Sequence, residues 1–238
     1  MKKLAIIPVF NEEGKISKVL EKFHQGLVDE ILVVNDGSTD RSHEEIERFK
    51  DKINLTLLHN DKRRGVGFSI RRGIDYGLGK NYDIAVILAG NGKDDPREIP
   101  ILTKPIENEG YDYVQGSRFL EGGRWDNLPL SRYIGIKLYS FFWSKFLGIR
   151  ITDVSNGFRA YRLSIFRDKR INIWQSWLDT YELEFYIHYK VITLGYKFKE
   201  VPVSKIYPIS GSYTKIRPFV DWWRLIKPFI YLHFLKRD

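Results

Sequence analysis

The chain contains no cysteine and no apolar run of membrane-spanning length. The absence of thiols excludes disulfide bonds and thiolate metal sites, and it fits a reducing compartment. A spanning helix needs about 18 or more consecutive apolar residues, and no segment approaches this. The apolar run from Leu4 to Val9 is too short for a signal peptide, and no small-residue cleavage site follows it. We therefore expect a cytoplasmic protein without a membrane span.

Acidic residues are outnumbered, because 39 lysines and arginines face 30 aspartates and glutamates and give a formal net charge of +9. A basic balance predicts anionic partners: nucleic acid, nucleotide phosphates or an anionic membrane surface. No segment resembles a nucleic-acid-binding module, so we expect no nucleic-acid partner. With 238 residues, the chain can form one large domain with a sizeable core. The sequence does not indicate an oligomeric state.

The apolar pattern predicts an α/β fold. Segments of helical periodicity alternate with four short apolar runs, at residues 4–9, 30–35, 55–59 and 84–88. Near-continuous apolar strands joined by helices predict a mostly parallel central sheet with helices on both faces. The second half has strand-like runs at 111–115 and 197–203, and helical stretches at 130–147, 181–194 and 219–235. We assign residues 1–215 to one domain and residues 216–238 to an amphipathic, aromatic and basic helical tail.

The polar loop after the run at residues 84–88 is the most informative segment. It reads Ala89-Gly90-Asn91-Gly92-Lys93-Asp94-Asp95. In an open parallel sheet, ligands bind at the carboxyl ends of the strands. Carboxylate and amide oxygens suit Mg²⁺ or Mn²⁺, whereas a lysine ammonium suits phosphate. The loop is therefore a candidate site for a metal, a phosphate or both.

Six motifs, in order along most of the chain, carry a resemblance to a known family. They are Pro8-Val9-Phe10-Asn11-Glu12, Val33 to Asp40, Asn60 with Gly65-Val66-Gly67, Gly116-Ser117-Arg118-Phe119, Asp153 with Ser155 to Arg159, and Glu200-Val201-Pro202-Val203. The first three resemble the opening motifs of family 2 glycosyltransferases. The others are similar to the polyprenyl-phosphate hexose synthase branch, typified by dolichyl-phosphate mannose synthase. The resemblance implies a Rossmann-like nucleotide-diphospho-sugar transferase fold of the GT-A type. It also implies an inverting hexosyltransferase of glycan or cell-envelope biosynthesis, acting on a polyprenyl phosphate or a lipid-linked glycan.

The resemblance implies two sets of binding residues. The nucleotide-sugar donor would be bound by Pro8, Phe10, Asn11, Glu12, Asp36, Gly65, Gly67, Asn91 and Arg118. The acceptor would be bound by Arg118, Arg132 and Lys215, since arginine suits phosphate. Each assignment has a plain structural alternative. Asp36 can be a cap or turn residue, Phe10 can pack in the core, the arginines can form surface ion pairs, and residues 60–72 can be a solvated basic face.

The metal motif of the family is altered in this chain. Where the family has Asp-x-Asp, the chain has Ala89, Gly90 and Asn91. Asn91 with Asp94 or Asp95 would be the remaining metal ligands, so we expect Mg²⁺ or Mn²⁺ to be weakly bound or dispensable. Lys93 would then stabilise the departing diphosphate in catalysis.

The catalytic base is open in the sequence. Asp153 or Glu184 would serve as base for a hydroxyl acceptor, whereas a phosphate acceptor needs no strong base. Two other functions also stay open: a non-catalytic nucleotide-sugar-binding protein with a degenerate metal site, and a nucleotidyltransferase. The glycine-rich Arg-Lys signature expected near the N-terminus of a nucleotidyltransferase is absent.

Aromatic and basic residues alternate in two helical stretches, at residues 139–146 and 219–235. A helix with aromatic residues on one face and lysine or arginine on the other can lie in a membrane interface. We therefore expect peripheral association with an anionic membrane, at the inner face of the cell membrane. In the tail, Pro228 would kink or break such a helix. The alternative for the tail is a helix docked on the domain core.

Overall fold

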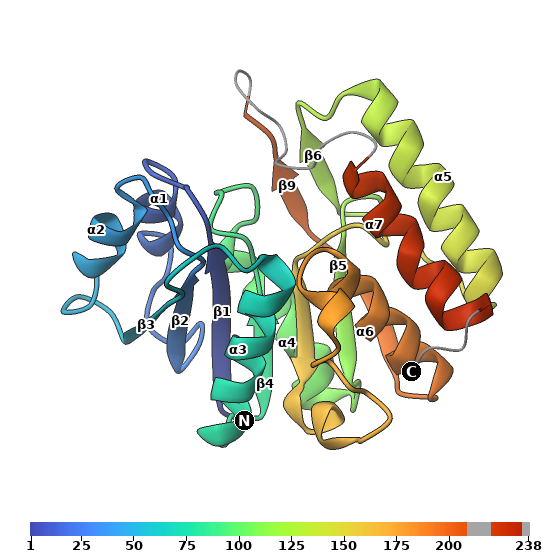
Figure 1. Cartoon of the computed structure of the whole chain (residues 1–238), viewed down its shortest axis with the longest axis horizontal. Helices are drawn as coiled ribbons and strands as arrows, with labels where there is room; N and C mark the ends of the chain where they lie inside the picture. Colours follow the sequence, from blue (N-terminus) through green and yellow to red (C-terminus); the bar gives the residue numbers. More distant parts are fainter. Residues whose placement is uncertain (209–219, 235–238) are drawn as a thin grey trace.

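Strands and helices alternate along residues 1–208 and 220–234, the part of the chain that the computed structural model describes (Figure 1). The strands are β1 (Lys3–Val9), β2 (Glu30–Asn35), β3 (Leu55–His59), β4 (Ile84–Ile87), β5 (Tyr113–Ser117), β6 (Arg124–Asp126), β7 (Arg159–Arg162), β8 (Phe198–Pro202) and β9 (Ser204–Ile206). The α-helices are α1 (Ile16–Leu20), α2 (Ser42–Glu47), α3 (Val66–Gly79), α4 (Ile99–Asn108), α5 (Leu130–Leu147), α6 (Glu182–Thr193) and α7 (Val220–Phe229). A π-helical turn, Ile230–Phe234, follows α7.

The central sheet has seven strands in the order β3-β2-β1-β4-β7-β5-β8. All neighbours are parallel except β7, which runs antiparallel to both β4 and β5. The predicted mostly parallel sheet is thus confirmed, and the four N-terminal apolar runs are its strands β1 to β4. Strand β7 is missed by the sequence pattern because it has only four residues and an arginine at each end. Strands β6 and β9 form a separate two-stranded parallel ladder.

Side chains alternate between the two faces of the sheet, as the pleat of a strand requires. In β1, Ala5 and Ile7 face a core that also holds Ile16 of α1 and Leu102 of α4. Leu4 and Ile6 face the opposite core, which is filled by apolar residues of α3 and α6. Both faces of the sheet are therefore covered, which explains why its strands read as continuous apolar runs.

The second half adds an aromatic cluster between α5, α6 and α7. Trp143 of α5 stacks on Phe185 of α6 with 5.8 Å between ring centroids. Phe229 of α7 lies 4.4 Å from the ring of Phe146, and Leu232 of the following turn is buried in the core. The described part of the C-terminal tail thus packs on the domain. Within residues 1–208 and 220–234, no helix is both long enough and apolar enough to cross a membrane.

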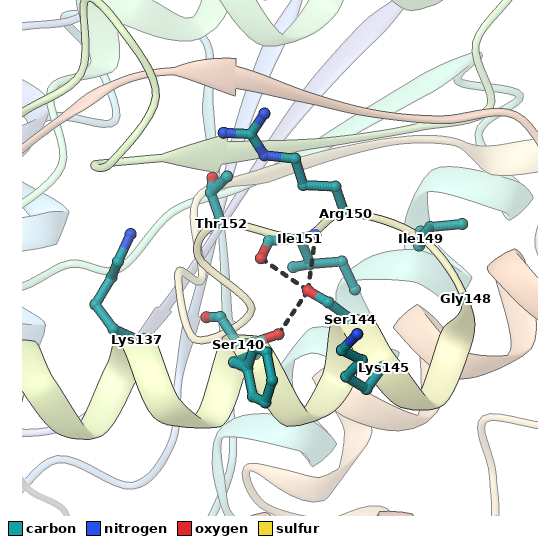
Figure 2. Close-up of a pocket in the computed structure, with 10 residues that line it drawn as sticks. Lys137, Ser140, Ser144, Lys145, Gly148, Ile149, Arg150, Ile151 and Thr152 are labelled. Atoms are coloured by element: carbon teal, nitrogen blue, oxygen red, sulfur yellow. Dashed lines mark hydrogen bonds between the residues drawn. The ribbon is translucent and has the colours of Figure 1, made fainter.

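Two serines join the segment after α5 to the helix itself, and Figure 2 shows the contact of Ser144 with Ile151. Gly148 has a φ of +68°, a left-handed conformation that glycine adopts without strain and that ends the helix. The chain then turns back, and the Ser144 hydroxyl accepts a hydrogen bond of 3.0 Å from the Ile151 amide. One turn earlier, the Ser140 hydroxyl accepts from the Val154 amide at 3.1 Å. The segment that leads into β7 is thereby fixed against α5.

Candidate active site

Loops from both halves of the chain meet at one edge of the central sheet. Strands β1, β2 and β4 are parallel and end there at Val9, Asn35 and Ile87. Strand β7 runs in the opposite direction, so it begins at this edge, with Arg159 paired to Ile87. Strand β5 ends there at Ser117, and the neighbouring β8 is parallel to it. The fold therefore gathers nearly every predicted site residue at the position where parallel α/β sheets bind ligands.

Asp36 follows β2 and is directed into the protein, with 3% of its surface exposed. Its carboxylate accepts hydrogen bonds from the Asn60 side chain at 2.7 Å and from the Arg64 and Gly65 amides, both at 2.8 Å. Hydrogen bonds to a carboxylate are stronger than those between neutral groups. Asp36 therefore holds the basic loop before α3 in place, and direct contact with a nucleotide stays a prediction.

The two glycines at the start of α3 make room for another part of the chain. A Cβ on Gly65 would collide with the carbonyl oxygen of Asp179, and one on Gly67 would collide with the carbonyl oxygen of Leu178. Gly65 also has a φ of +112°, which side-chain-bearing residues rarely adopt. The space on the Cβ side of both glycines is filled by protein. Contact of Gly65 and Gly67 with the nucleotide-sugar donor stays a prediction.

Phe10, just after β1, is partly exposed and lies under a guanidinium group. The Cζ atom of Arg63 is 4.2 Å from the ring centroid of Phe10. Arg63 itself is exposed, as are its neighbours Lys62 and Arg64. Arginine over an aromatic face is a cation–π arrangement, and both planar groups are also suited to stacking on a nucleobase. The position of Phe10 argues against the alternative that it simply packs in the core.

The remaining residues of the first motif hold two loops together. Asn11 has a φ of +50°, which asparagine tolerates, and its side-chain oxygen accepts from the Thr39 amide at 2.9 Å. The Glu12 amide donates to the Ser42 hydroxyl at 2.8 Å. Pro8 is partly buried within β1. These contacts join the loop after β1 to the loop after β2.

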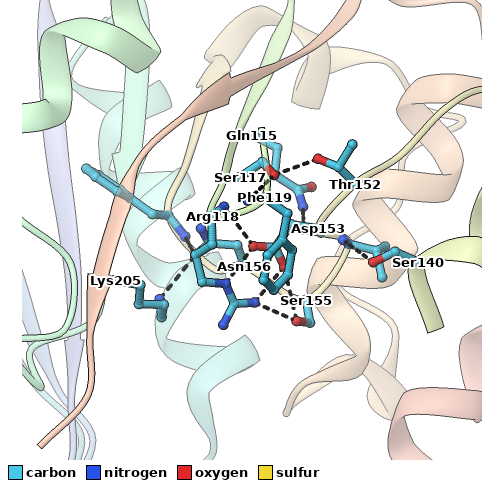
Figure 3. Close-up of polar contacts among 12 residues, drawn as sticks. Gln115, Ser117, Arg118, Phe119, Ser140, Thr152, Asp153, Ser155, Asn156 and Lys205 are labelled. Atoms are coloured by element: carbon cyan, nitrogen blue, oxygen red, sulfur yellow. Dashed lines mark hydrogen bonds and ion pairs between the residues drawn. The ribbon is translucent and has the colours of Figure 1, made fainter. Parts of the chain in front are cut away.

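Arg118 and Asp153 form a buried ion pair at the centre of this edge (Figure 3). Asp153 accepts from the Arg118 Nη2 atom at 2.5 Å, from Nε at 2.6 Å and from the backbone amide at 3.1 Å. The two side chains are 2% and 0% exposed, so the alternative of a surface ion pair for Arg118 is wrong. A carboxylate held by a two-pronged pair is a poor proton acceptor. The geometry therefore favours Asp153 as a positioning residue over a catalytic base.

The peptide segment at Asp153 is held in turn by Glu200 of β8. Glu200 accepts from the Thr152 amide and hydroxyl, both at 2.8 Å, and from the Asp153 amide at 3.0 Å. Burial raises the pKa of the Glu200 carboxyl, although these hydrogen bonds oppose the rise. The Thr152 hydroxyl also lies 2.6 Å from that of Ser117.

Three cationic side chains surround the buried ring of Tyr207, and we call Lys93, Arg118, Arg132 and Tyr207 the Tyr207 cluster. Arg118 donates to the Tyr207 hydroxyl. Lys93 Nζ and Arg132 Cζ each lie 5.4 Å from the centre of the ring. The Ile206 amide donates to the Lys93 carbonyl at 3.0 Å, which fastens the loop after β4 to β9.

The charge of the Tyr207 cluster is predominantly positive. Burial, reinforced by the nearby charges of Lys205 and Arg132, lowers the pKa of Lys93 to about 8. Burial also lowers the pKa of Arg132, and Arg118 adds to the shift. Asp153 pairs with Arg118, and the carboxylates of Glu12 and Asp94 oppose the shift at Lys93. Three cations, of which Arg118 is buried and Lys93 and Arg132 are partly exposed, favour an anionic ligand.

The predicted metal ligands do not fit a divalent cation. Asp94 is ion-paired with Lys205 at 2.6 Å, and its second oxygen is buried without a hydrogen-bond partner. Asp95 instead binds Arg97 at 2.6 Å, and the Asn91 side-chain oxygen accepts from the Lys93 amide at 3.1 Å. Across the described residues, no group of three or more His, Cys, Asp or Glu side chains gathers to hold a metal. The positive charge of Lys205 and Lys93 beside Asp94 further disfavours a second cation.

Glu184, the other predicted base, lies at the start of α6. Its Oε1 atom is 3.7 Å from Nε of Arg159, and the same carboxylate lies beside Gly157 in the loop before β7. No described contact joins Glu184 to the Tyr207 cluster. Lys215, predicted to bind the acceptor, lies outside the described residues.

Sequence reasoning left the central position of Tyr207 unassigned. Val203, Lys205 and Tyr207 occupy alternate positions after β8, and side chains two residues apart share one face of an extended chain. The pair Lys205 and Tyr207 faces the loop after β4, which carries Lys93 and Asp94. This two-residue alternation in the sequence could have predicted that Lys205 and Tyr207 lie on the same face as Val203.

The fold and the gathered polar edge define a nucleotide-diphospho-sugar transferase of the GT-A type. Residues 4–169 match glycosyl transferase family 2, and the chain belongs to that family. It is therefore a glycosyltransferase. An uncharacterized protein of Methanocaldococcus jannaschii is 30% identical over 96% of this chain and 99% of its own length.

Named relatives belong to the branch that the motifs indicated. The undecaprenyl-phosphate mannosyltransferase of Micrococcus luteus is 28% identical, over 86% of this chain and 83% of its own. The polyprenol monophosphomannose synthase of Mycolicibacterium smegmatis is 27% identical, over 84% and 76%. Glucosyl-3-phosphoglycerate synthase from Mycobacterium tuberculosis, crystallised with Mn²⁺ and UDP, has the same fold. Its TM-score is 0.69 at 17% identity, covering 97% of this chain and 78% of its own.

Proposed function

We propose that this glycosyltransferase moves a hexose from a nucleotide-diphospho-sugar to a polyprenyl phosphate. The names of the Micrococcus and Mycolicibacterium relatives support this acceptor class. The observation that carries the proposal is the Tyr207 cluster, which concentrates cations at the edge of the sheet where ligands of this fold bind. Both substrates bring phosphate groups to that edge, so a site with a positive excess serves both.

The reaction needs little acid–base chemistry from the protein. An oxygen of the acceptor phosphate attacks the anomeric carbon, the bond from that carbon to the donor diphosphate breaks, and the nucleoside diphosphate leaves with inversion. A phosphate monoester is already ionised at neutral pH, so no proton has to be removed. Asp153 can therefore remain paired with Arg118 throughout the reaction.

Lys93 and Arg132 have the positions and charge to stabilise the leaving diphosphate. Fixed positive groups aimed at a site of developing negative charge lower the barrier, because they need no reorganisation during the reaction. With a pKa of about 8, Lys93 is mostly protonated at neutral pH. We propose that these side chains supply the charge stabilisation that a divalent ion would otherwise supply, so that transfer depends little on Mg²⁺ or Mn²⁺.

The donor nucleotide would bind at the same edge of the sheet, at the loops that follow β1 and β2. Phe10 and Arg63 offer planar surfaces for a base, and Asn11, Glu12 and Asp36 fix the loops around it. The exposed basic loop before α3 would attract the phosphates by long-range steering.

We further propose that the enzyme works at the surface of an anionic membrane, where polyprenyl phosphates reside. Helix α5 exposes apolar side chains along the side opposite its buried residues. They are Leu130 (72% exposed), Ile134 (48%), Leu138 (54%), Phe141 (54%) and Phe142 (62%). Large apolar surfaces left in water mark a binding face. A helix of this kind can lie in the membrane interface without crossing it.

Transfer to a defined acceptor tests the proposed function. The full chain is incubated with a panel of radiolabelled nucleotide sugars, with and without undecaprenyl phosphate, and lipid-linked sugar is extracted and counted. We expect acceptor-dependent product with at least one donor. Donor binding without turnover, in every combination of sugar and acceptor, would instead identify a non-catalytic nucleotide-sugar-binding protein.

A further inference from the structure

A pocket beside α5 is separate from the Tyr207 cluster. It lies between the helix and the returning segment at residues 148–152, and its volume is about 540 Å³ (Figure 2). The lining includes Lys137 and Lys145 of the helix and Arg150 of the returning segment. Neither Arg118 nor Arg132 lines it. The pocket is therefore a second site, outside the proposed reaction centre.

The walls of this pocket are held in place by the serine contacts described above. Ser140 and Ser144 are both among its lining residues. The Ser144 hydroxyl binds the Ile151 amide within the returning segment, and the Ser140 hydroxyl binds the Val154 amide just after it. The left-handed turn at Gly148 closes one end of the pocket. These contacts fix the distance between α5 and the segment that carries Arg150, so the pocket is a built feature of the fold.

The charge of the pocket is positive and uncompensated. Lys137, Lys145 and Arg150 line it together with neutral residues, and no carboxylate contributes to the lining. Lys137 lies over the ring of Phe119 and Lys145 over that of Phe141, at 5.0 and 5.7 Å from the ring centres. Within the described residues, none of the three cations forms an ion pair with a carboxylate. Three exposed cations around a neutral hollow favour a phosphate-bearing ligand.

The surroundings of the pocket indicate which phosphate it receives. Phe141 lines the pocket and also belongs to the exposed apolar stripe of α5. A ligand held there has its anionic part among the cations and its remaining part beside Leu138, Phe141 and Phe142, which are all exposed. Cations beside an exposed apolar surface match the anionic headgroup and the acyl chains of a lipid.

We propose that this pocket binds the phosphate headgroup of an anionic phospholipid of the membrane on which the enzyme works. The inference rests on the membrane association under Proposed function, but not on the identity of the sugar or of the acceptor. Thr152 at the base of the pocket adjoins Asp153, the partner of Arg118. A headgroup bound there would hold α5 on the membrane at a fixed orientation to the reaction centre.

Flotation of the full chain with vesicles tests the proposal. The vesicles contain phosphatidylcholine alone or phosphatidylcholine with phosphatidylglycerol. The pocket variant carries Lys145→Gln and Arg150→Gln. The matched control carries Lys18→Gln and Lys104→Gln, two exposed lysines on α1 and α4 that remove the same charge elsewhere.

We expect the pocket variant to bind the anionic vesicles about thirtyfold more weakly than the parent, since both removed charges lie at the membrane surface. The control should stay within about twofold, because distant charges are screened in salt. Equal losses in both variants would mean diffuse attraction and would overturn the pocket. So would failure of the parent to bind anionic vesicles.

Two further measurements complete the test. The first distinguishes a lipid headgroup from free phosphate as the ligand, and the second distinguishes failure of the pocket proposal from failure of the proposed function. Binding of inorganic phosphate alone is measured by calorimetry, with and without anionic vesicles. If the parent binds phosphate, the pocket variant does not, and anionic vesicles leave that binding unchanged, the ligand is a free anion and the lipid assignment fails. Transfer to a short-chain, water-soluble polyprenyl phosphate should be unchanged in the pocket variant. Absence of that transfer in the parent would refute the proposed function and leave the vesicle result standing.

Discussion

Replacing Lys93 by methionine should make the protein more stable and much less active. Burial and the neighbouring charges of Lys205 and Arg132 lower the pKa of Lys93 from 10.5 to about 8. Each pKa unit corresponds to about 1.4 kcal/mol, so the charged lysine destabilises the fold by roughly 3 kcal/mol before screening. Because the side chain is partly exposed, we reduce this to roughly 1–2 kcal/mol. Methionine has a similar length and no charge, so Lys93→Met should recover that free energy.

The same substitution should remove charge stabilisation from the leaving diphosphate. Loss of one preorganised donor typically costs about 10²–10³ in turnover. Urea unfolding at neutral pH measures the first effect, and radiolabelled sugar transfer measures the second. Our reasoning fails if Lys93→Met unfolds at lower urea than the parent, or if it retains parental turnover. Lys104→Met, on the exposed side of α4, serves as the control for both measurements.

The pH dependence of stability gives an independent check on Lys93. Its pKa is lower in the folded state than in the unfolded state, so the penalty is fully present below about pH 8, where both states are protonated. As the pH rises from about 8 toward 10.5, the folded state releases its proton first and the penalty disappears. The stability advantage of Lys93→Met over the parent should therefore shrink across this window. An advantage that is constant with pH would show that the charge is not its cause.

Four further outcomes are expected. Asp36→Ala should weaken nucleoside-diphosphate binding by about 1–3 kcal/mol in calorimetry, because the loop before α3 loses its buried acceptor; unchanged affinity would place the nucleotide elsewhere. Arg118→Met should lower the free energy of unfolding by about 3–5 kcal/mol, since it strands the buried Asp153 carboxylate; adding Asp153→Leu should restore part of that loss in thermal melts. Gly65→Ala should fold poorly by circular dichroism, because its Cβ meets backbone and its φ is positive. A chelator should leave sugar transfer largely intact, and abolished transfer would restore a metal-dependent site.

The strands of the first half could be predicted because a strand that is buried on both faces of a sheet needs apolar residues at nearly every position. Ile31 to Val34 has no polar interruption, and the structure places it beside β1 in the sheet. Strand β7 could not be predicted in the same way, because the charged residue Arg159 begins it and is nevertheless buried. Its guanidinium donates to carbonyl oxygens of Val154 and Asn156, which are nearby in the chain, and of Glu184, which is 25 residues away. An apolar pattern does not show that a charged side chain is buried by such hydrogen bonds.

The candidate site was predictable in its location more than in the roles of its residues. Motif order placed Asp36, Lys93 and Arg118 at strand ends, and the fold brings those ends to one edge. The partners of each side chain depend on residues far along the chain. The Asp36 carboxylate accepts hydrogen bonds from the loop before α3. Arg118 forms its ion pair with Asp153, which is 35 positions away. A residue type at a strand end therefore indicates where chemistry occurs, whereas its partners decide whether it touches substrate.

The close contact of Gly65 and Gly67 with residues 178–180 limits how the two halves of the chain can move relative to each other. Arg71 of α3 reinforces it by donating to the carbonyl oxygens of Ile173 and Gln175, both at 3.0 Å, and by pairing with Asp179. Hinge closure requires a few residues that can swing while the rest move as separate bodies. Here α3, which covers the first half of the sheet, is joined to the segment leading into α6, so we expect the two halves to move together. Among the described residues, we therefore expect the donor to be met by the exposed side chains of the basic loop at residues 61–64, and not by a bending between the two halves.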